Sequence, residues 1–313
     1  MKHVTLFLLN CLISHLAWSQ NSTQLPEVCC GEIVREHNFK SKYISARNID
    51  VWLPEGYSAE QKYAVVYMHD GQMLYDANST WNKQEWGVDE TMSALMKKGT
   101  IQPCIVVGVF NSSTTRHPDY FPQKPFESLA KEVKDSLLNK AQRHGQASLF
   151  SVNVQSDNYL KFLVEELKPF IDGKYSTRTD RENTFVMGSS MGGLISMYAI
   201  CEYPEVFGGA ACLSTHWPGT FTNENNPIPA AFFSYMKGHL PSPGTHKIYF
   251  DFGTATLDAM YEEHQTKVDE IMKAKGFTSK NWMTRKFEGE NHSENAWKKR
   301  LHIPVKFLLN KVQ

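Results

Sequence analysis

The chain has 313 residues, 41% of them hydrophobic, and its 33 basic residues balance 33 acidic ones, so the formal net charge is zero. This length and composition support one large hydrophobic core, and a single α/β domain can reach this size. A balanced charge provides no long-range field for collecting nucleic acid or an anionic membrane surface. We therefore expect a small or neutral partner that binds in a local pocket.

The first nineteen residues have the features of a signal peptide. A short positive start precedes a mostly apolar run from Val4 to Leu16, and the small residues Ala17 and Ser19 form a signal-peptidase site before Gln20. The apolar run is too short to span a membrane. We expect cleavage, export to the periplasm or the medium, and one domain over residues 20–313. An uncleaved amphiphilic N-terminus is the alternative.

The cysteines do not form a disulfide pattern. Five remain after cleavage, which is an odd number without paired spacing: Cys29, Cys30, Cys104, Cys201 and Cys212. Cys104 and Cys212 border apolar runs, so we expect both to be small core residues. Adjacent Cys29 and Cys30 are predicted either to pair elsewhere or to stay free.

Short apolar runs alternate with helical patterns along the chain. Several runs are continuously apolar, as a sheet covered on both faces requires, and the alternation predicts an α/β fold with a mostly parallel central sheet and helices on both faces. Two earlier segments, Glu32 to Phe39 and Asn48 to Leu53, are predicted as an antiparallel entry to the sheet. The other predicted strands are Tyr63 to Met68, Ile105 to Phe110, Phe185 to Met187, Gly209 to Leu213, Ile248 to Phe252 and Trp282 to Phe287.

Apolar residues recur at helical spacing over residues 160–171 and 257–271, and Gly276 provides a stop after the second helix. Residues 112–155 show no regular spacing of apolar residues, and a helical spacing begins only at Asn158. A long irregular segment in a compact domain is usually a lid, a binding loop or disordered, and its aromatic residues argue against simple disorder. We interpret it as a lid-like insertion over the site.

The most informative segment is a Gly-x-Ser-x-Gly pattern, Gly188 to Gly192, directly between an apolar strand and a helix-forming stretch. A nucleophilic serine in this pattern sits on a strained strand-to-helix turn, and the two glycines let the backbone close without a Cβ clash. Ser190 is favoured over its neighbour Ser189 because only Ser190 has a glycine two residues away on both sides. The alternative is an ordinary glycine-rich turn.

A serine hydroxyl needs a general base to act as a nucleophile at neutral pH. In the α/β-hydrolase order, the histidine follows the serine and the carboxylate along the chain. His292 lies in a polar loop after the strand that ends at Phe287, whereas His302 lies inside the final helix. We therefore predict His292 as the base; an ordinary surface histidine is the alternative.

The carboxylate is expected just beyond the strand Ile248 to Phe252. Asp258 is preferred because the acid of such a triad comes from the loop after the strand, although an aspartate there is also a favoured helix N-cap. Asp251 lies within the strand and stays open as an alternative. Glu262 and Glu263 lie further into the helix and are weaker choices.

Two backbone amides are expected to stabilise the oxyanion. The helix that begins at Met191 directs its amides and its positive dipole end at the developing charge. The second donor is expected in the loop after an early strand, at Asp70 or Gly71. His69 and Asp70 lack a companion ligand spacing, so no metal site is predicted.

Together these segments resemble the enterochelin-esterase and esterase D-like superfamily, often labelled putative esterase. The resemblance covers nearly all of the chain after the leader and rests on four segments: His69 to Gln72, Gly188 to Gly193, Asp251 to Thr254 and Gly289 to Trp297. It implies an α/β-hydrolase that needs no cofactor, with a triad of Ser190, His292 and a carboxylate at or near Asp258, and Met191 as one oxyanion donor. Asp70 after His69 departs from the simpler His-Gly motif, so the second donor stays open.

The family includes siderophore esterases, feruloyl and acetyl-xylan esterases, S-formylglutathione hydrolases and mycolyltransferases. Its pockets carry variable aromatic and basic residues, so the resemblance makes four residues candidates for the acyl or sugar side: Arg116, Trp86, Tyr120 and Trp217. Each of the four could equally be ordinary packing.

The predicted function is hydrolysis of a carboxylic ester through an acyl-enzyme, on an exported small-molecule or oligosaccharide substrate. Esterified plant polysaccharide fragments and ester-linked siderophores are the two leading substrates. An acyltransferase that passes the acyl group to a sugar and a non-catalytic binding module are the alternatives. The oligomeric state is not predicted.

Overall fold

A computed structural model describes residues 24–143, 147–222 and 224–310. The predicted signal peptide, residues 1–19, lies outside the described residues. Within these ranges, every helix is too short or too polar to cross a bilayer.

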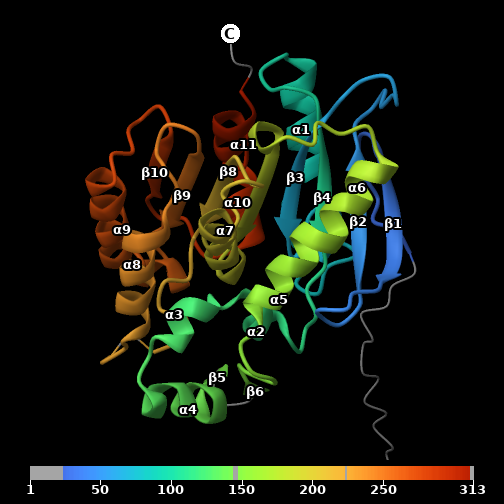
Figure 1. The fold of residues 1–313 in the computed structure, drawn as a ribbon. Helices are drawn as coiled ribbons and strands as arrows, with labels where there is room; N and C mark the ends of the chain where they lie inside the picture. Colours follow the sequence, from blue (N-terminus) through green and yellow to red (C-terminus); the bar gives the residue numbers. More distant parts are fainter. Residues whose placement is uncertain (1–23, 144–146, 223, 311–313) are drawn as a thin grey trace, which may run out of the picture.

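An eight-stranded sheet forms the centre of the molecule (Figure 1). All neighbouring strands are parallel except at β2, which is antiparallel to β1 and to β4. This confirms the predicted, mostly parallel α/β sheet with its antiparallel entry. In spatial order the strands are β1 (Glu32–Phe39), β2 (Arg47–Leu53), β4 (Cys104–Val109), β3 (Ala64–His69), β7 (Thr184–Ser189), β8 (Gly209–Leu213), β9 (Lys247–Gly253) and β10 (Trp282–Phe287).

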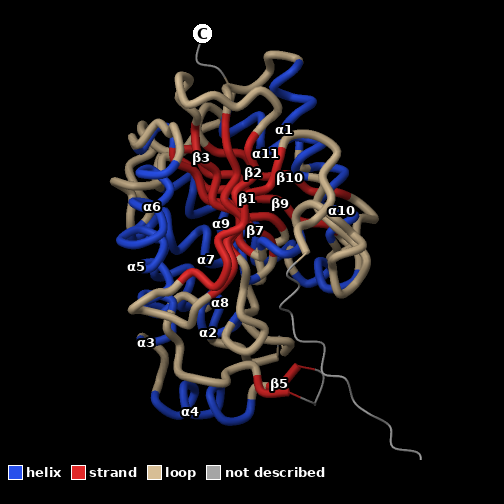
Figure 2. The backbone as a smooth tube through the Cα atoms, turned by 90° about the vertical axis from the view of Figure 1, so that its right-hand side faces the viewer, coloured by secondary structure: helices blue, strands red, loops and turns tan. Residues whose placement is uncertain are grey.

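Helices cover both faces of the sheet, as Figure 2 shows for α5 and α6 on one side and α10 on the other. Alternate strand residues face opposite ways, so Val65 and Tyr67 of β3 join one apolar cluster and Val66 and Met68 join the other. One face carries α1 (Val88–Lys97), α10 (Glu294–Arg300) and α11 (His302–Leu309). The other carries α5 (Ser156–Lys161), α6 (Lys168–Lys174), α7 (Met191–Glu202), α8 (Ile228–His239) and α9 (Glu262–Ala274).

Both predicted helices change their winding along their length. The first passes from α5 through the π-helical turn η2 (Phe162–Leu167) into α6, and the second begins as the 3-10 helix η4 (Thr256–Met260) before α9. Gly276 ends the second helix with a φ of 88°. Its amide donates to Lys273 and that of Phe277 donates to Met272, which is the left-handed C-terminal motif that favours glycine.

The segment 112–155 contains short helices and a small hairpin. Its elements are α2 (Arg116–Tyr120), α3 (Gln123–Glu127), α4 (Lys131–Lys140), β5 (Gln142–Arg143) and β6 (Ala147–Ser148). The helices α2 and α3 have only five residues, and α4 buries none of its side chains, so the sequence has no apolar period there. Figures 1 and 2 place α4 and β5 at one end of the sheet.

All five described cysteines are free. Cys104 and Cys212 are fully buried in the core, as expected. The thiols of Cys29 and Cys30 lie 2.9 Å apart at the surface.

Candidate active site

The polar residues of the site follow the carboxyl ends of neighbouring parallel strands, where ligands bind in open α/β sheets. Asp70 follows β3, Asn111 lies just beyond β4, Ser190 follows β7 and Ser214 follows β8. Asp258 and His292 lie in the segments after β9 and β10. The strand order therefore brings residues from six separate segments to one edge of the sheet.

Ser190 occupies a strained turn between β7 and α7. Its backbone has φ 58° and ψ −120°, which a non-glycine residue rarely adopts. The turn is so tight that a Cβ on Gly188 would lie 2.8 Å from the carbonyl carbon of Gly192. A Cβ on Gly192 would lie 3.4 Å from the nearest atom, in His69, which is an ordinary contact. Only Gly188 is therefore required for closure of the turn.

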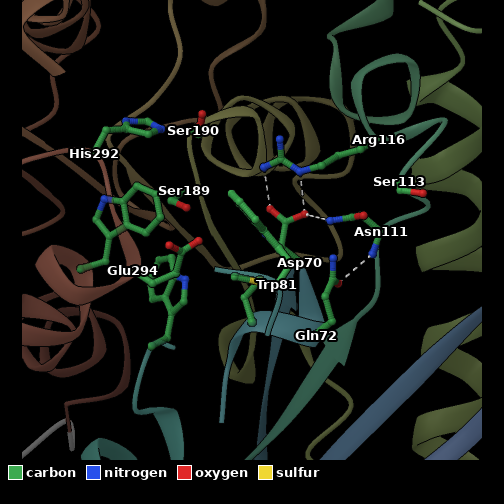
Figure 3. A pocket seen from close by; sticks show the side chains of 13 residues that line it. Asp70, Gln72, Trp81, Asn111, Ser113, Arg116, Ser189, Ser190, His292 and Glu294 are labelled. Carbon is green, nitrogen blue, oxygen red and sulfur yellow. Dashed lines mark hydrogen bonds and ion pairs between the residues drawn. The ribbon is translucent and has the colours of Figure 1, made fainter. Parts of the chain in front are cut away.

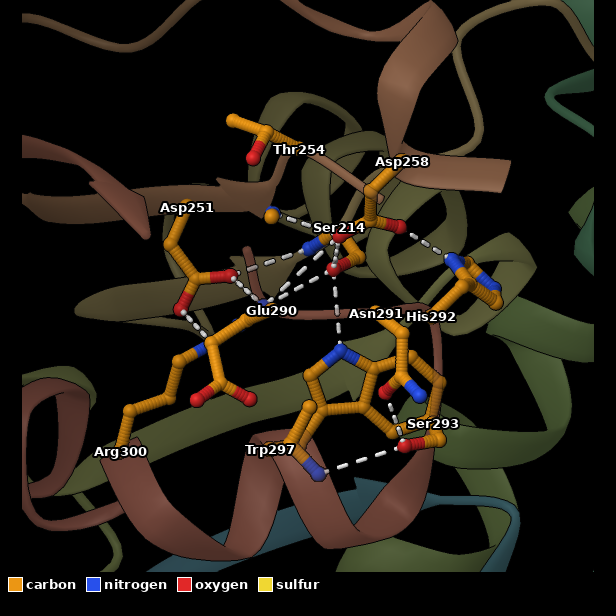
Figure 4. Close-up of polar contacts among 12 residues, drawn as sticks. Ser214, Asp251, Thr254, Asp258, Glu290, Asn291, His292, Ser293, Trp297 and Arg300 are labelled. Carbon is orange, nitrogen blue, oxygen red and sulfur yellow. Dashed lines mark hydrogen bonds and ion pairs between the residues drawn. The ribbon is translucent and has the colours of Figure 1, made fainter. Parts of the chain in front are cut away.

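His292 contacts Asp258 and not Asp251. The distance between His292 Nδ1 and Asp258 Oδ1 is 2.5 Å (Figure 4). Asp258 is fully buried, and its Oδ2 accepts hydrogen bonds from the Ser214 hydroxyl at 2.5 Å and the Gly253 amide at 2.6 Å. Burial alone would raise the pKa of Asp258, but the hydrogen bonds from His292, Ser214 and Gly253 lower it below its ordinary value.

Asp251 belongs to a buried network of hydrogen bonds next to the His292–Asp258 pair. Its carboxylate forms an ion pair with Arg300, with an Nη2–Oδ1 distance of 2.9 Å, and accepts a hydrogen bond from the Tyr249 hydroxyl at 2.9 Å. Burial raises the pKa of Asp251 despite this pairing. Ser214 joins the two carboxylates, because its backbone amide donates to Asp251 while its hydroxyl donates to Asp258. The same hydroxyl accepts from Trp297 Nε1 and Arg300 Nη2, each at 2.9 Å (Figure 4).

The backbone near Ser190 offers two amides without helical acceptors. Met191 is the first residue of α7, and Gly71 is the first residue of the 3-10 helix η1 (Gly71–Met73), where amides lack an intrahelical partner. The Asp70 amide instead faces the Tyr120 hydroxyl at 3.4 Å. Of the two residues predicted for the second donor, Asp70 thus has its amide engaged by a side chain, and Gly71 stays the candidate. Gly71 cannot carry a side chain, since a Cβ there would lie 2.4 Å from the Gly108 carbonyl carbon.

Asp70 is held by an ion pair with Arg116. Arg116 binds both of its carboxylate oxygens at 2.7 Å, and Asn111 Nδ2 donates to Oδ1 at 2.6 Å. Burial would raise the pKa of Asp70, but Arg116 and Asn111 lower it below its ordinary value. The left-handed backbone of Asp70, with φ 59°, places it at the start of η1. This bidentate pair ties the insertion to the end of β3.

Two cavities meet at Ser190. The first has a volume of about 340 Å³ and the second about 250 Å³. Both are lined by Ser113, Arg116, Ser190 and His292. In Figure 3, His292 and Glu294 lie on one side of the first cavity and Asp70, Asn111 and Arg116 on the other. The rest of the first wall comprises Gln72, Met73, Trp81, Trp86, Ser189 and Trp297, and the rest of the second comprises Thr114, His117, Ser148, Leu149, Met191, His216, Phe221 and Leu257.

The four residues predicted for substrate binding occupy different environments. Arg116 lines both cavities, and Trp86 lines the first. Tyr120 and Trp217 are fully buried and, within the described part of the chain, line neither cavity. The Trp217 indole donates to Gln265 instead, at 3.1 Å. Tyr120 and Trp217 therefore match the alternative interpretation of ordinary packing.

Sequence reasoning missed several groups that line or support the site. Trp81 and Glu294 line the first cavity, and Ser214 and Arg300 support Asp258 from below. A tryptophan within a polar segment was the one available signal, because Trp81 stands between Thr80 and Asn82. His302 is exposed in α11, away from these residues. Among the described residues, no three or more His, Cys, Asp or Glu side chains gather as a metal site would require.

The sequence pattern of the Putative esterase family matches residues 42–307 of the chain. The chain belongs to this family. Uncharacterized protein YbbA of Bacillus subtilis is 23% identical over 239 residues, which cover 74% of this chain and 80% of that protein. The esterase is therefore a carboxylic-ester hydrolase with an α/β-hydrolase fold.

Two solved structures share the fold of this esterase. The ferulic acid esterase of Anaeromyces mucronatus, in complex with ferulic acid, has a TM-score of 0.61 at 18% identity, with 91% of this chain and 93% of that chain covered. The enterobactin esterase of Shigella flexneri has a TM-score of 0.60 at 16% identity, with 91% and 60% covered.

Proposed function

We propose that this esterase acts through a Ser190–His292–Asp258 triad and an acyl-enzyme. One observation carries the proposal: the strained Ser190 and the His292–Asp258 pair meet at the junction of the two cavities. Each arm of a bound ester can then occupy one cavity with its carbonyl carbon beside Ser190. The oxyanion donors in this scheme are the amides of Met191 and Gly71.

His292 Nε2 removes the proton from Ser190 as Oγ attacks the ester carbonyl, and the carbonyl π electrons move to the oxygen. The Met191 and Gly71 amides stabilise that negative charge. The tetrahedral intermediate collapses, the bond to the alcohol oxygen breaks, and His292 returns the proton to the leaving alcohol. Water then repeats these steps on the acyl-enzyme and releases the acid. Asp258 fixes the proton on Nδ1 and stabilises the imidazolium that forms in each half.

We propose esters of feruloyl or acetyl groups on a carbohydrate as the substrate. Support comes from the fold shared with a ferulic acid esterase and from the aromatic and polar lining of the first cavity. A siderophore ester is the second candidate, supported by the fold shared with the enterobactin esterase. Export through the N-terminal segment would bring the enzyme to either substrate. Mass spectrometry of the protein recovered from a secreting host tests export, with Gln20 expected as the first residue.

A fluorophosphonate probe tests the nucleophile. It is expected to label the wild-type protein on Ser190, while Ser190→Ala loses both labelling and turnover of 4-nitrophenyl acetate, by at least about 10⁴-fold, with unchanged thermal unfolding. Ser189→Ala is the matched control and should keep both. Full turnover in Ser190→Ala would exclude the proposed triad.

A further inference from the structure

Trp81 is exposed at the wall of the first cavity. Its side chain is 69% accessible, whereas Trp86 and Trp297 of the same wall are 3% and 4% accessible. Leu25 and Val152 are the other exposed large apolar side chains in the described part of the chain, and neither lines this cavity. When a ligand covers the face of a solvent-exposed indole, apolar surface leaves the water and the free energy of the complex falls.

Hydrogen-bonding groups stand on both sides of the same cavity. Glu294 is fixed through Oε2, which accepts from Asn82 Nδ2 at 2.9 Å, so Oε1 is left as an acceptor. Opposite it, Asn111 donates its Nδ2 to Asp70 and keeps its carbonyl oxygen as an acceptor. Gln72 accepts the Asn111 amide through Oε1, which leaves its NH₂ group as a donor. The wall of the first cavity therefore combines the exposed indole face of Trp81 with hydrogen-bond donors and acceptors.

We infer that the first cavity is the subsite for a sugar, with Trp81 as the stacking surface and Glu294 as the acceptor for sugar hydroxyls. A pyranose or furanose ring has an apolar C–H face, and its hydroxyls both donate and accept hydrogen bonds, so it matches this combination of groups. The inference rests on the proposed function, because it places the sugar oxygen of the ester beside Ser190.

A cationic alcohol such as choline fits the cavity less well. Recognition of an ammonium group uses several aromatic faces and uncompensated negative charge. The rings of Trp86 and Trp297 pack against each other, with centroids 5.3 Å apart and planes at 31°. The charge of Asp70 is already balanced by Arg116. Among the described residues, the cavity thus offers one exposed aromatic face, and the charge of Glu294 already acts on the Arg116 guanidinium. The hydrogen-bond donors of the cavity are groups that a cation cannot use.

The second cavity complements this assignment. Leu149, Phe221 and Leu257 form an apolar part of a wall that is otherwise mostly polar, and this part suits the acyl arm of the same ester. The two cavities share Ser190 and His292, so an ester with its acyl group in the second cavity has its sugar in the first.

Three esters of one acyl group isolate the contribution of the alcohol. Methanol, methyl β-D-xylopyranoside and choline are esterified with cinnamate, and the set is repeated with acetate. Trp81→Ala and Glu294→Gln are expected to lower the xyloside-to-methyl ratio of kcat/KM by about tenfold, mainly through KM, without changing kcat/KM for the methyl esters. Val152→Ala, which removes exposed apolar surface outside both cavities, is the control and should leave every ratio unchanged.

Binding of free methyl β-D-xylopyranoside to Ser190→Ala, followed by saturation-transfer NMR, provides a readout independent of turnover. The signal is expected in Ser190→Ala and should disappear when Trp81→Ala is added. Equal losses on the methyl and xyloside esters, no sugar signal, or a choline preference that depends on Glu294 would each overturn the sugar subsite. A wild-type protein that cleaves none of the six esters but still binds the xyloside at Trp81 would count against the hydrolytic proposal and leave the subsite standing.

Discussion

Two aspartates near Ser190 are held in opposite ways. Asp258 is fully buried, and its partners lie at the carboxyl ends of three adjacent strands: Gly253 ends β9, Ser214 follows β8 and His292 lies after β10. Asp70 lies in the wall of a cavity and is paired with Arg116, whose side chain is 30% accessible and belongs to the insertion. The region around Asp258 is therefore fixed by the sheet, whereas the wall around Asp70 depends on loops.

In the proposed mechanism, this difference separates the reacting groups from the residues that select the substrate. A buried polar network is stable only when its members are paired, so changes there affect either the fold or the orientation of His292. A partly solvated wall tolerates substitution, and its side chains can vary while the reacting groups keep their positions. Replacing residues of each kind tests this separation.

The largest effect is expected at Asp258. Asp258→Asn keeps the size of the side chain but can no longer hold the proton on Nδ1 of His292, so kcat should fall by about 10³–10⁴-fold. Steady-state kinetics with 4-nitrophenyl acetate, together with circular dichroism at rising temperature, measures both the loss and the integrity of the fold.

Asp251→Asn is the matched comparison, because Asp251 is equally buried but does not contact His292. Its removal leaves Arg300 with only Asp258 as a counter-charge, at an Nη2–Oδ2 distance of 4.0 Å, which should lower the free energy of unfolding by roughly 3–5 kcal/mol. Turnover of the folded fraction should fall far less than in Asp258→Asn. A larger loss of kcat in Asp251→Asn would reverse the proposed roles of the two carboxylates.

A smaller effect is expected at Ser214, which positions Asp258 without facing the substrate. Ser214→Ala removes a hydrogen bond to the Asp258 carboxylate and the acceptor of Trp297 Nε1 and Arg300 Nη2, and kcat should fall by about 10–100-fold. The native pKa of Asp258 lies below its ordinary value, partly because of Ser214. Loss of that bond raises the pKa, so Asp258 is protonated at higher pH and the acid limb of kcat/KM moves to higher pH.

A pH–rate profile of Ser214→Ala distinguishes positioning from packing. Ser214→Thr, which keeps the hydroxyl, should restore the position of the acid limb even where the added methyl group lowers stability. If Ser214→Ala loses activity without any shift of that limb, its role is confined to packing.

The strands and the turn at Ser190 could be predicted because they depend on local patterns. Every strand of the main sheet was predicted, several of them from continuously apolar runs, and the spacing of Gly188, Ser190 and Gly192 predicted the turn after β7. The choice between Asp258 and Asp251 depends on contacts with Ser214 and Arg300, 37 to 49 residues away from Asp251 along the chain. No local pattern contains that information.

The cavity walls were the least predictable part of the site. Trp217 and Trp81 both stand near polar residues in the sequence, yet the first is fully buried and the second is 69% accessible. The difference arises from tertiary packing, since Trp217 lies against Phe250 of β9 and donates to Gln265 of α9. Composition identifies aromatic residues but not the surface to which each one contributes.

The smallest effect on turnover is expected at Trp217. Trp217→Phe removes one buried hydrogen bond and part of the indole volume, so the free energy of unfolding should fall by about 1–3 kcal/mol. Because Trp217 lies in the core and lines neither cavity among the described residues, kcat/KM should stay within about twofold of wild type for both the methyl and the xyloside esters, in contrast to Trp81→Ala. Denaturant unfolding and the same kinetic panel measure the two quantities. A selective loss on the xyloside esters would instead place Trp217 among the residues that recognise the substrate, and the separation between core and cavity wall would then fail at this position.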